Sequence, residues 1–231
     1  MGTSNNSQHK IHERILSLFA NQTSPKVLNE LLQAADQGKL NLGGEQRTIS
    51  VVFIDMRGYT TLAENLHPRD VMEIINVYIG IIGDALINYG GTLTQYGGDQ
   101  VMAVFNAPLD QPDHAERAVR SAIVAIQSVA QFNRSPAARS LPALAVFGAG
   151  INTGMAIVGN VGTEQRHIYT AIGDVVNVAA RLCDQADPRT IYLSTNTLSQ
   201  DLGDISQVTE PLGQVHVKGR LEPLDVHRIT L

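Results

Sequence analysis

Two short segments, FIDMRGYT at Phe53–Thr60 and YGGDQVMAVF at Tyr96–Phe105, each place one aspartate beside an apolar run and a glycine-containing turn. The apolar runs are typical of buried strands, and the Gly97–Gly98 pair is typical of a tight turn between strands. The aspartates are Asp55, at the end of the first run, and Asp99, in the turn. We therefore expect the two carboxylates to meet where neighbouring strands of one sheet end.

The residues around these segments alternate between strand and helix patterns. Apolar residues recur at helical spacing from Pro68 until the stop signal Gly90–Gly91. Asp113 and Glu116 form a capping-box pattern before a second amphipathic helix that ends near Phe132. The chain continues with strand-like residues around GAGINTGMAIVGNVG, the helix VVNVAARLCDQA, the strand TIYLS, a short helix and two closing strands.

This order predicts an α+β fold, a ferredoxin-like βαββαβ sandwich with additional C-terminal strands. We expect a mainly antiparallel sheet with the helices packed on one face. Residues 47–231 form the main domain, and residues 1–46 are expected to form a flexible N-terminus and a helical lead-in or linker. Within the lead-in, Ser24 and Pro25 fit the cap and first turn of a helix.

The composition excludes several classes of protein. The 231 residues carry a net charge of -5 and no run of Lys or Arg, which argues against nucleic-acid binding. A single cysteine, Cys183, excludes an internal disulfide framework and a cysteine-rich metal site, and we expect it to be a small core residue. No apolar run reaches the ~20 residues that span a bilayer, and the N-terminus lacks a signal peptide. A soluble, cytoplasmic domain is expected.

The two aspartates suggest a metal site. Asp55 and Asp99 are hard oxygen ligands without accompanying His or Cys, a set that suits Mg²⁺ or Mn²⁺. Gly58, Tyr59 and Thr60 follow the first strand, where successive backbone N–H groups can bind an anion. The simpler alternative is that both aspartates are turn residues and that the glycine segment is a plain strand-to-helix turn.

Four ordered motifs together resemble a known family. The segments VVFIDMRGYTTLAE, YGGDQVMAVF, AIGDVVNVAARL and VKGRLEPLDVHRI occur in the order found in class III nucleotidyl cyclase catalytic domains, and the resemblance covers about Arg47 to Leu231. It implies conversion of a nucleoside triphosphate to a cyclic 3',5'-monophosphate and pyrophosphate, with two Mg²⁺ or Mn²⁺ ions per site. The segment before Arg47 looks like the connection to an upstream regulatory domain. Whether the native full chain is attached to a membrane is therefore left open.

The resemblance also assigns roles to residues at the metal site. Asp55 and Asp99 match the metal-binding aspartates of the family, and the carbonyl of Ile54 is implied as a further ligand. One ion would lower the pKa of the 3'-hydroxyl and the other would hold the triphosphate.

Three further residues match substrate-binding positions of the family. The resemblance implies that Asn177 orients the ribose and that Arg181 stabilises charge on the α-phosphate. Because they lie at i and i+4 on one helix face, both side chains can reach the same site. Lys218 would bind the terminal phosphates. From the residues alone, a cap-proximal Asn, a solvated Arg and a solubilising Lys remain the alternative.

Base selection departs from the family pattern. Gln95 stands where the family commonly has lysine, and Thr170 stands at the partner position, which places the chain near the threonine-bearing adenylate cyclase subgroup. Both side chains can bind adenine, but both can also reverse donor and acceptor roles and accept guanine. Some members of this subgroup respond to bicarbonate, which makes bicarbonate a candidate activator.

The resemblance implies a homodimer with shared active sites that convert ATP. Asp55 and Asp99 would act from one subunit and the other site residues from its partner, with the strand pair at Gly148–Tyr169 as a dimerisation hairpin. Two alternatives stay open. One is a guanylate or dual-specificity cyclase, and the other is a degenerate nucleotide-binding module in a signalling protein.

Overall fold

The computed structural model describes residues 2–20, 22–39, 44–163, 166–216 and 222–231. The helices are α1 (Gly2–Phe19), α2 (Pro25–Asp36), α3 (Tyr59–Asn65), α4 (Pro68–Asn88), α5 (His114–Asn133), α6 (Asp174–Gln185) and α7 (Thr195–Leu198), with 3-10 turns η1 (Pro136–Ser140) and η2 (Gly203–Val208). The strands are β1 (Glu45–Met56), β2 (Thr92–Gly97), β3 (Gln100–Phe105), β4 (Phe147–Thr163), β5 (Arg166–Ile172), β6 (Thr190–Ser194), β7 (Glu210–Val215) and β8 (Leu224–Thr230).

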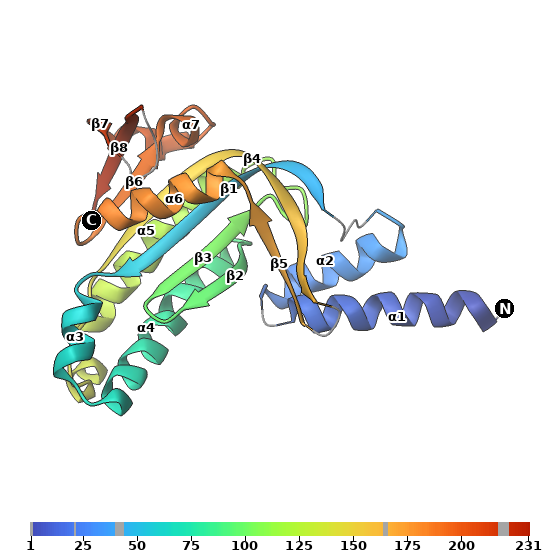
Figure 1. Cartoon of the computed structure of the whole chain (residues 1–231), viewed down its shortest axis with the longest axis horizontal. Helices are drawn as coiled ribbons and strands as arrows, with labels where there is room; N and C mark the ends of the chain where they lie inside the picture. The colour runs from blue at the N-terminus through green and yellow to red at the C-terminus, as the bar shows by residue number, and fades with distance from the viewer. Residues whose placement is uncertain (1, 21, 40–43, 164–165, 217–221) are drawn as a thin grey trace.

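All strands of the described chain belong to one sheet. Its order is β2-β3-β1-β4-β6-β8-β7, and β5 pairs with β4 outside this path. The first four strands and the helices α4 and α5 have the ferredoxin-like arrangement, so this part of the prediction is confirmed. The pairing is antiparallel except between β4 and β6. The additional C-terminal strands extend the sheet on the β6 side (Figure 1).

The prediction that the helices pack on one face of the sheet was wrong. Val52 and Ile54 of β1 pack in the core under α4 and α5, whereas Val51 and Phe53 pack on the other face with α6, α1 and α2. Figure 1 shows α6 and α4 on opposite sides of β1. A central strand that is covered on both faces reads as a continuous apolar run, so the run Val51–Ile54 indicated two covered faces but not which helices cover them.

The first two helices expected in the main domain are present, but one predicted cap is not. α4 begins at Pro68 and ends before Gly90, as its periodicity indicates. At the start of α5, Asp113 is the N-cap residue but makes no side-chain capping bond. Arg117 donates to the Asp113 carboxylate instead, at 2.7 Å. Arg120 likewise donates to the Glu116 carboxylate, four residues before it, at 2.8 Å. These ion pairs along the helix replace the capping box.

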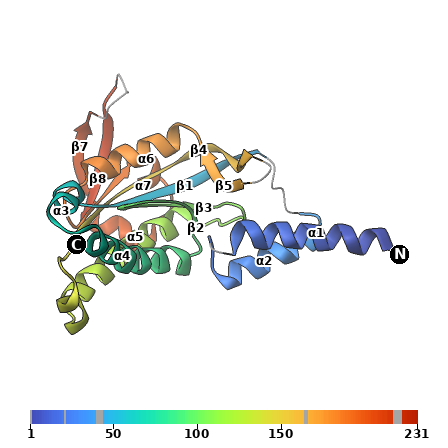
Figure 2. The same cartoon turned by 60° about the horizontal axis from the view of Figure 1, so that its bottom comes forward.

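The N-terminal lead-in packs against the main domain. Ile15, Phe19 and Leu31 are fully buried, and the Phe19 ring lies 5.0 Å from that of Tyr169 on β5. The predicted Ser24 cap is confirmed because its hydroxyl accepts from the Val27 amide at 3.2 Å. α1 begins at Gly2, within the segment expected to be mobile, and extends away from the sheet (Figure 2). The described helices include none with the length and apolar character to cross a membrane.

Candidate active site

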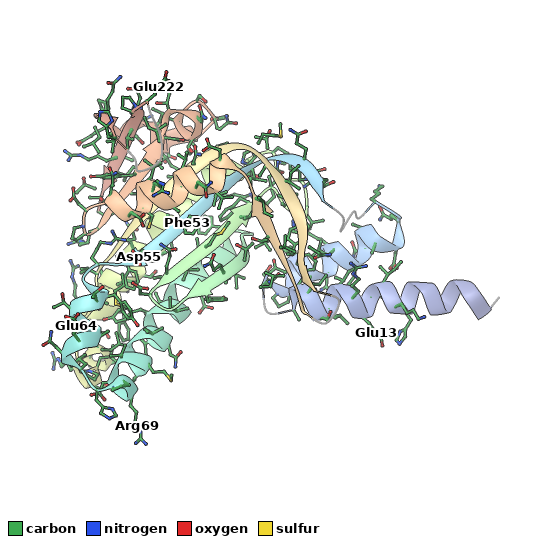
Figure 3. The ribbon with its side chains drawn as sticks, viewed as in Figure 1. Glu13, Phe53, Asp55, Glu64, Arg69 and Glu222 are labelled. Carbon is green, nitrogen blue, oxygen red and sulfur yellow. The ribbon has the colours of Figure 1, made fainter. Side chains whose placement is uncertain are left out.

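The fold brings the two sequence-predicted metal ligands together. Asp55 pairs with Gln100 across the β1–β3 ladder, and Asp99 is the preceding turn residue. The amide of Met56 donates to the carbonyl of Asp99 at 3.0 Å, which fixes the turn against the end of β1. Figure 3 shows Asp55 at this end of β1, two residues beyond Phe53. The expectation that neighbouring strands carry both aspartates is confirmed.

The electrostatics of this pair favour a cation. Burial, opposed by the charge of Arg57 and assisted by the negative charge of Asp99, raises the pKa of Asp55 to about 6. A divalent cation between the carboxylates would relieve this repulsion. Within the described residues no cluster of three His, Cys, Asp or Glu side chains could hold a metal. Two hard oxygen ligands fit Mg²⁺ or Mn²⁺ if the remaining ligands are water and phosphate.

Two main-chain features adjoin the aspartates. Ile54 is fully buried in register with Val101 and Ala149, so only its carbonyl remains a predicted ligand. Gly58 adopts a left-handed conformation with φ 77° and is the N-cap of α3 without a side-chain capping bond. Tyr59 and Thr60 begin that helix. The prediction that these three residues bind phosphate oxygens rests on this turn.

Arg57 is a site residue that our sequence analysis did not identify. Its Nη2 donates to Oδ2 of Asp55 at 2.6 Å, and its Nε donates to the Asp55 carbonyl at 3.3 Å. Its Nη1 reaches the carbonyls of Cys183, Asp184 and Ala186 at the end of α6. The only sequence signal was a charged residue directly after a buried strand, since its partners on α6 are distant in the chain.

Asn177 and Arg181 lie on α6, which packs closely on the sheet. Gly150 of β4 faces the α6 backbone so closely that a Cβ there would lie 2.1 Å from the amide nitrogen of Cys183. The side-chain amide of Asn152 donates to the Val175 carbonyl at 3.1 Å and holds the first turn. Asn177 is exposed and Arg181 is half-buried.

The predicted base-reading residues come from β2 and β5. Gln95 is exposed and lies just after an irregularity in the β2–β3 register. Thr170 is half-buried and pairs with Gly159. Strands β2 and β5, which carry these two residues, contact each other. Lys218 lies outside the described residues.

The outward face of the β4–β5 hairpin is apolar. The exposed apolar side chains on it are Met155, Ile157, Val161, Ile168 and Ile172, each between 39% and 57% exposed. Thr170 lies between two apolar cross-strand pairs of this face. Tyr169 and Ala171 point the other way and are buried. We call these five apolar residues the hairpin face. Exposed apolar stripes of this kind mark interaction surfaces.

Comparison with known proteins defines the family. The model of the adenylate and guanylate cyclase catalytic domain matches residues 44–229. With the ferredoxin-like core and the paired aspartates described above, this match shows that the chain belongs to the adenylate and guanylate cyclase catalytic-domain family.

Individual relatives include enzymes named for either nucleotide. Adenylate cyclase 1 of Rhizobium meliloti is 34% identical over 185 residues, which cover 80% of this chain and 28% of that protein. The crystal structure of the adenylyl cyclase CyaB from P. aeruginosa is 31% identical, with a TM-score of 0.75, over 82% of this chain and 97% of that one. The guanylyl cyclase Cya2 is 32% identical, with a TM-score of 0.73, over 81% and 93%. The chain therefore spans less than a third of the Rhizobium protein.

Proposed function

We propose that this chain is the catalytic domain of an adenylate cyclase, which converts ATP to 3',5'-cyclic AMP and pyrophosphate at sites shared between two copies. Asp55 and Asp99 bind the divalent ions in one copy. Gln95, Thr170, Asn177, Arg181 and Lys218 bind the same nucleotide from the other copy.

The observation that carries this proposal is that four predicted nucleotide-binding side chains have no partner in the described part of the chain. Gln95, Thr170, Asn177 and Arg181 make no side-chain hydrogen bond or ion pair with the described part of the chain. A half-buried guanidinium such as that of Arg181 ordinarily has a carboxylate or carbonyl partner. The hairpin face beside Thr170 is equally uncovered. A second copy on this face would bury its apolar side chains and bring its Asp55 and Asp99, with the nucleotide they hold, to the unpartnered groups.

The residues have separate tasks in the proposed reaction. Bound Mg²⁺ or Mn²⁺ supplies Lewis-acid activation of the 3'-hydroxyl and charge neutralisation at the phosphates. Asp55 and Asp99 provide the negative charge that holds the ions. Asn177 orients the ribose so that its hydroxyl faces the α-phosphate, and Arg181 stabilises the charge that develops there. Lys218 binds the terminal phosphates.

Base preference depends on Gln95 and Thr170. For adenine, the Gln95 amide would donate to N1 and the Thr170 hydroxyl would accept from the exocyclic amine. Both groups can reverse these roles, so GTP is the second candidate substrate, and the likeness to the guanylyl cyclase Cya2 favours testing it. We place ATP first because of the likeness to two adenylate cyclases.

Subunit mixing tests the shared site. Asp55→Ala and Asn177→Ala homodimers should each be nearly inactive with ATP and Mn²⁺, because every site carries one lesion. In a mixed dimer one site carries both lesions and the other carries none. Equal mixing should restore about a quarter of wild-type cyclic AMP production, because half the dimers are mixed and each has one intact site.

The control is a mixture of Asp55→Ala with Asp99→Ala, which damages the metal set of both copies and should stay inactive. Mixed-dimer formation is verified by native mass spectrometry. Verified Asp55→Ala and Asn177→Ala heterodimers that are as inactive as their parents would contradict the shared-site arrangement. Wild-type protein that forms no cyclic nucleotide from ATP or GTP would contradict cyclase activity.

A further inference from the structure

Arg57 connects two parts of the candidate active site that belong to different elements. It lies in the turn between β1 and α3, and its amide donates to the Val146 carbonyl at 2.8 Å, which fixes its backbone. Its side chain is 16% exposed and that of Asp55 is 19% exposed. The 2.6 Å contact between them is therefore a largely desolvated, charge-assisted hydrogen bond.

The other half of the Arg57 guanidinium is bound to the C-terminal end of α6. Nη1 lies 3.1 Å from the Cys183 carbonyl and 3.3 Å from each of the Asp184 and Ala186 carbonyls. The last carbonyls of a helix have no partner within the helix and carry the negative end of its dipole. Arg57 thus serves as a cap for α6, supplied from the turn that follows the strand carrying Asp55.

We propose that Arg57 is a positioning residue that competes with the divalent ion for Asp55 and couples ion binding to the last turn of α6. The proposal rests on the proposed function, which makes Asp55 a metal ligand. Before an ion binds, the guanidinium neutralises Asp55 and ties it to α6. An ion on Asp55 takes over that charge, and Arg57 no longer joins the carboxylate to the helix.

The coupling reaches the residues proposed to act on the nucleotide. Arg181 lies two residues before Cys183, whose carbonyl Arg57 binds. Asn177 lies one helical turn before Arg181. In a dimer with shared sites these two residues would serve the nucleotide held by the other copy's aspartates. Ion binding in one site would then loosen the end of the helix that contributes to the second site.

The first test measures binding of Mn²⁺ alone to the full chain by electron paramagnetic resonance at pH 8. Arg57→Gln removes the competing charge and should bind Mn²⁺ about 10-fold more tightly than wild type, the size expected for one charge-assisted contact. Arg57→Lys retains the charge but not the planar fork, and its affinity should stay within about 3-fold of wild type.

The second test measures hydrogen exchange of the α6 end, which separates coupling from affinity. In wild type, Mn²⁺ should speed amide exchange over Cys183–Ala186 because the tether to Asp55 is lost. In both Arg57 variants this segment should exchange faster without Mn²⁺ and should not respond to it. Arg47→Gln is the matched control. Arg47 lies on β1 and also pairs with carboxylates, those of Glu45 and Asp110, and its loss should change neither readout.

The outcomes separate this inference from the function on which it rests. Mn²⁺ binding that Asp55→Asn does not weaken would overturn both the metal assignment and the coupling. Asp55-dependent binding that is not tighter in a folded Arg57→Gln variant would overturn the competition alone. An α6 end that responds equally to Mn²⁺ in wild type and Arg57→Lys would overturn the coupling.

Discussion

Replacing Gly150 by alanine should displace α6 from the sheet. A Cβ on this residue of β4 would lie 2.1 Å from the Cys183 nitrogen and 2.4 Å from the Ala179 carbonyl oxygen. Both are backbone atoms, so no side-chain rotation can relieve the contact. Ordinary contacts begin near 3.4 Å, so α6 must move outward by about 1.3 Å.

The displacement has separate costs for stability and for activity. Forcing an extra methyl group into a packed core costs about 1–3 kcal/mol, and each kcal/mol lowers the Tm of a chain of this size by about 2–4 °C. A misplacement of about 1 Å in a catalytic group costs about 100-fold in rate, and α6 carries Asn177 and Arg181. Mn²⁺ should still bind, because Asp55 and Asp99 lie on other elements, but moving the Cys183 carbonyl away from Arg57 should shift its affinity.

The measurements are thermal unfolding by circular dichroism, cyclic AMP production and Mn²⁺ affinity. Gly80→Ala is the control, because Gly80 lies within α4 and a Cβ there meets no atom within 4 Å. That variant should be as stable as wild type or more stable by up to about 1 kcal/mol. A Gly150→Ala protein with wild-type Tm and turnover would refute the packing argument. Loss of Mn²⁺ binding would show that the damage is not confined to α6.

Two further predictions concern base choice and pH. Gln95→Lys should raise the ratio of kcat/KM for ATP to that for GTP, because a fixed donor suits adenine N1 and opposes the N1–H of guanine. An unchanged ratio would show that Gln95 does not contact the base. Burial holds the pKa of His114 below its usual 6.5, so protonation favours the unfolded chain, and wild-type stability should fall as pH drops below 6.5. His114→Gln should reduce that fall in urea titrations at pH 7.5 and 5.5, and an identical loss in both proteins would exclude His114 as a cause.

The sequence alone determined the elements whose signals are local. Pro68 and Gly90 bound α4 because a proline fits a first turn and a glycine permits the left-handed stop. The Gly97–Gly98 turn set the β2–β3 hairpin and thereby brought Asp99 beside the strand that carries Asp55. The same reasoning failed for the Asp113–Glu116 capping box, because helix-face arginines compete for the same carboxylates.

Only the tertiary structure decided how the layers and the site are assembled. Periodicity records that a residue is buried but not what covers it, so the position of α6 across the sheet from α4 could not be read from the apolar run of β1. The contact of Arg57 with the Cys183 carbonyl joins residues 126 positions apart. No local pattern encodes such a pair, because it depends on the path of the chain through β4 and α6. The hairpin face was likewise visible only after folding, when one side of β4–β5 packed on the lead-in and the other stayed exposed.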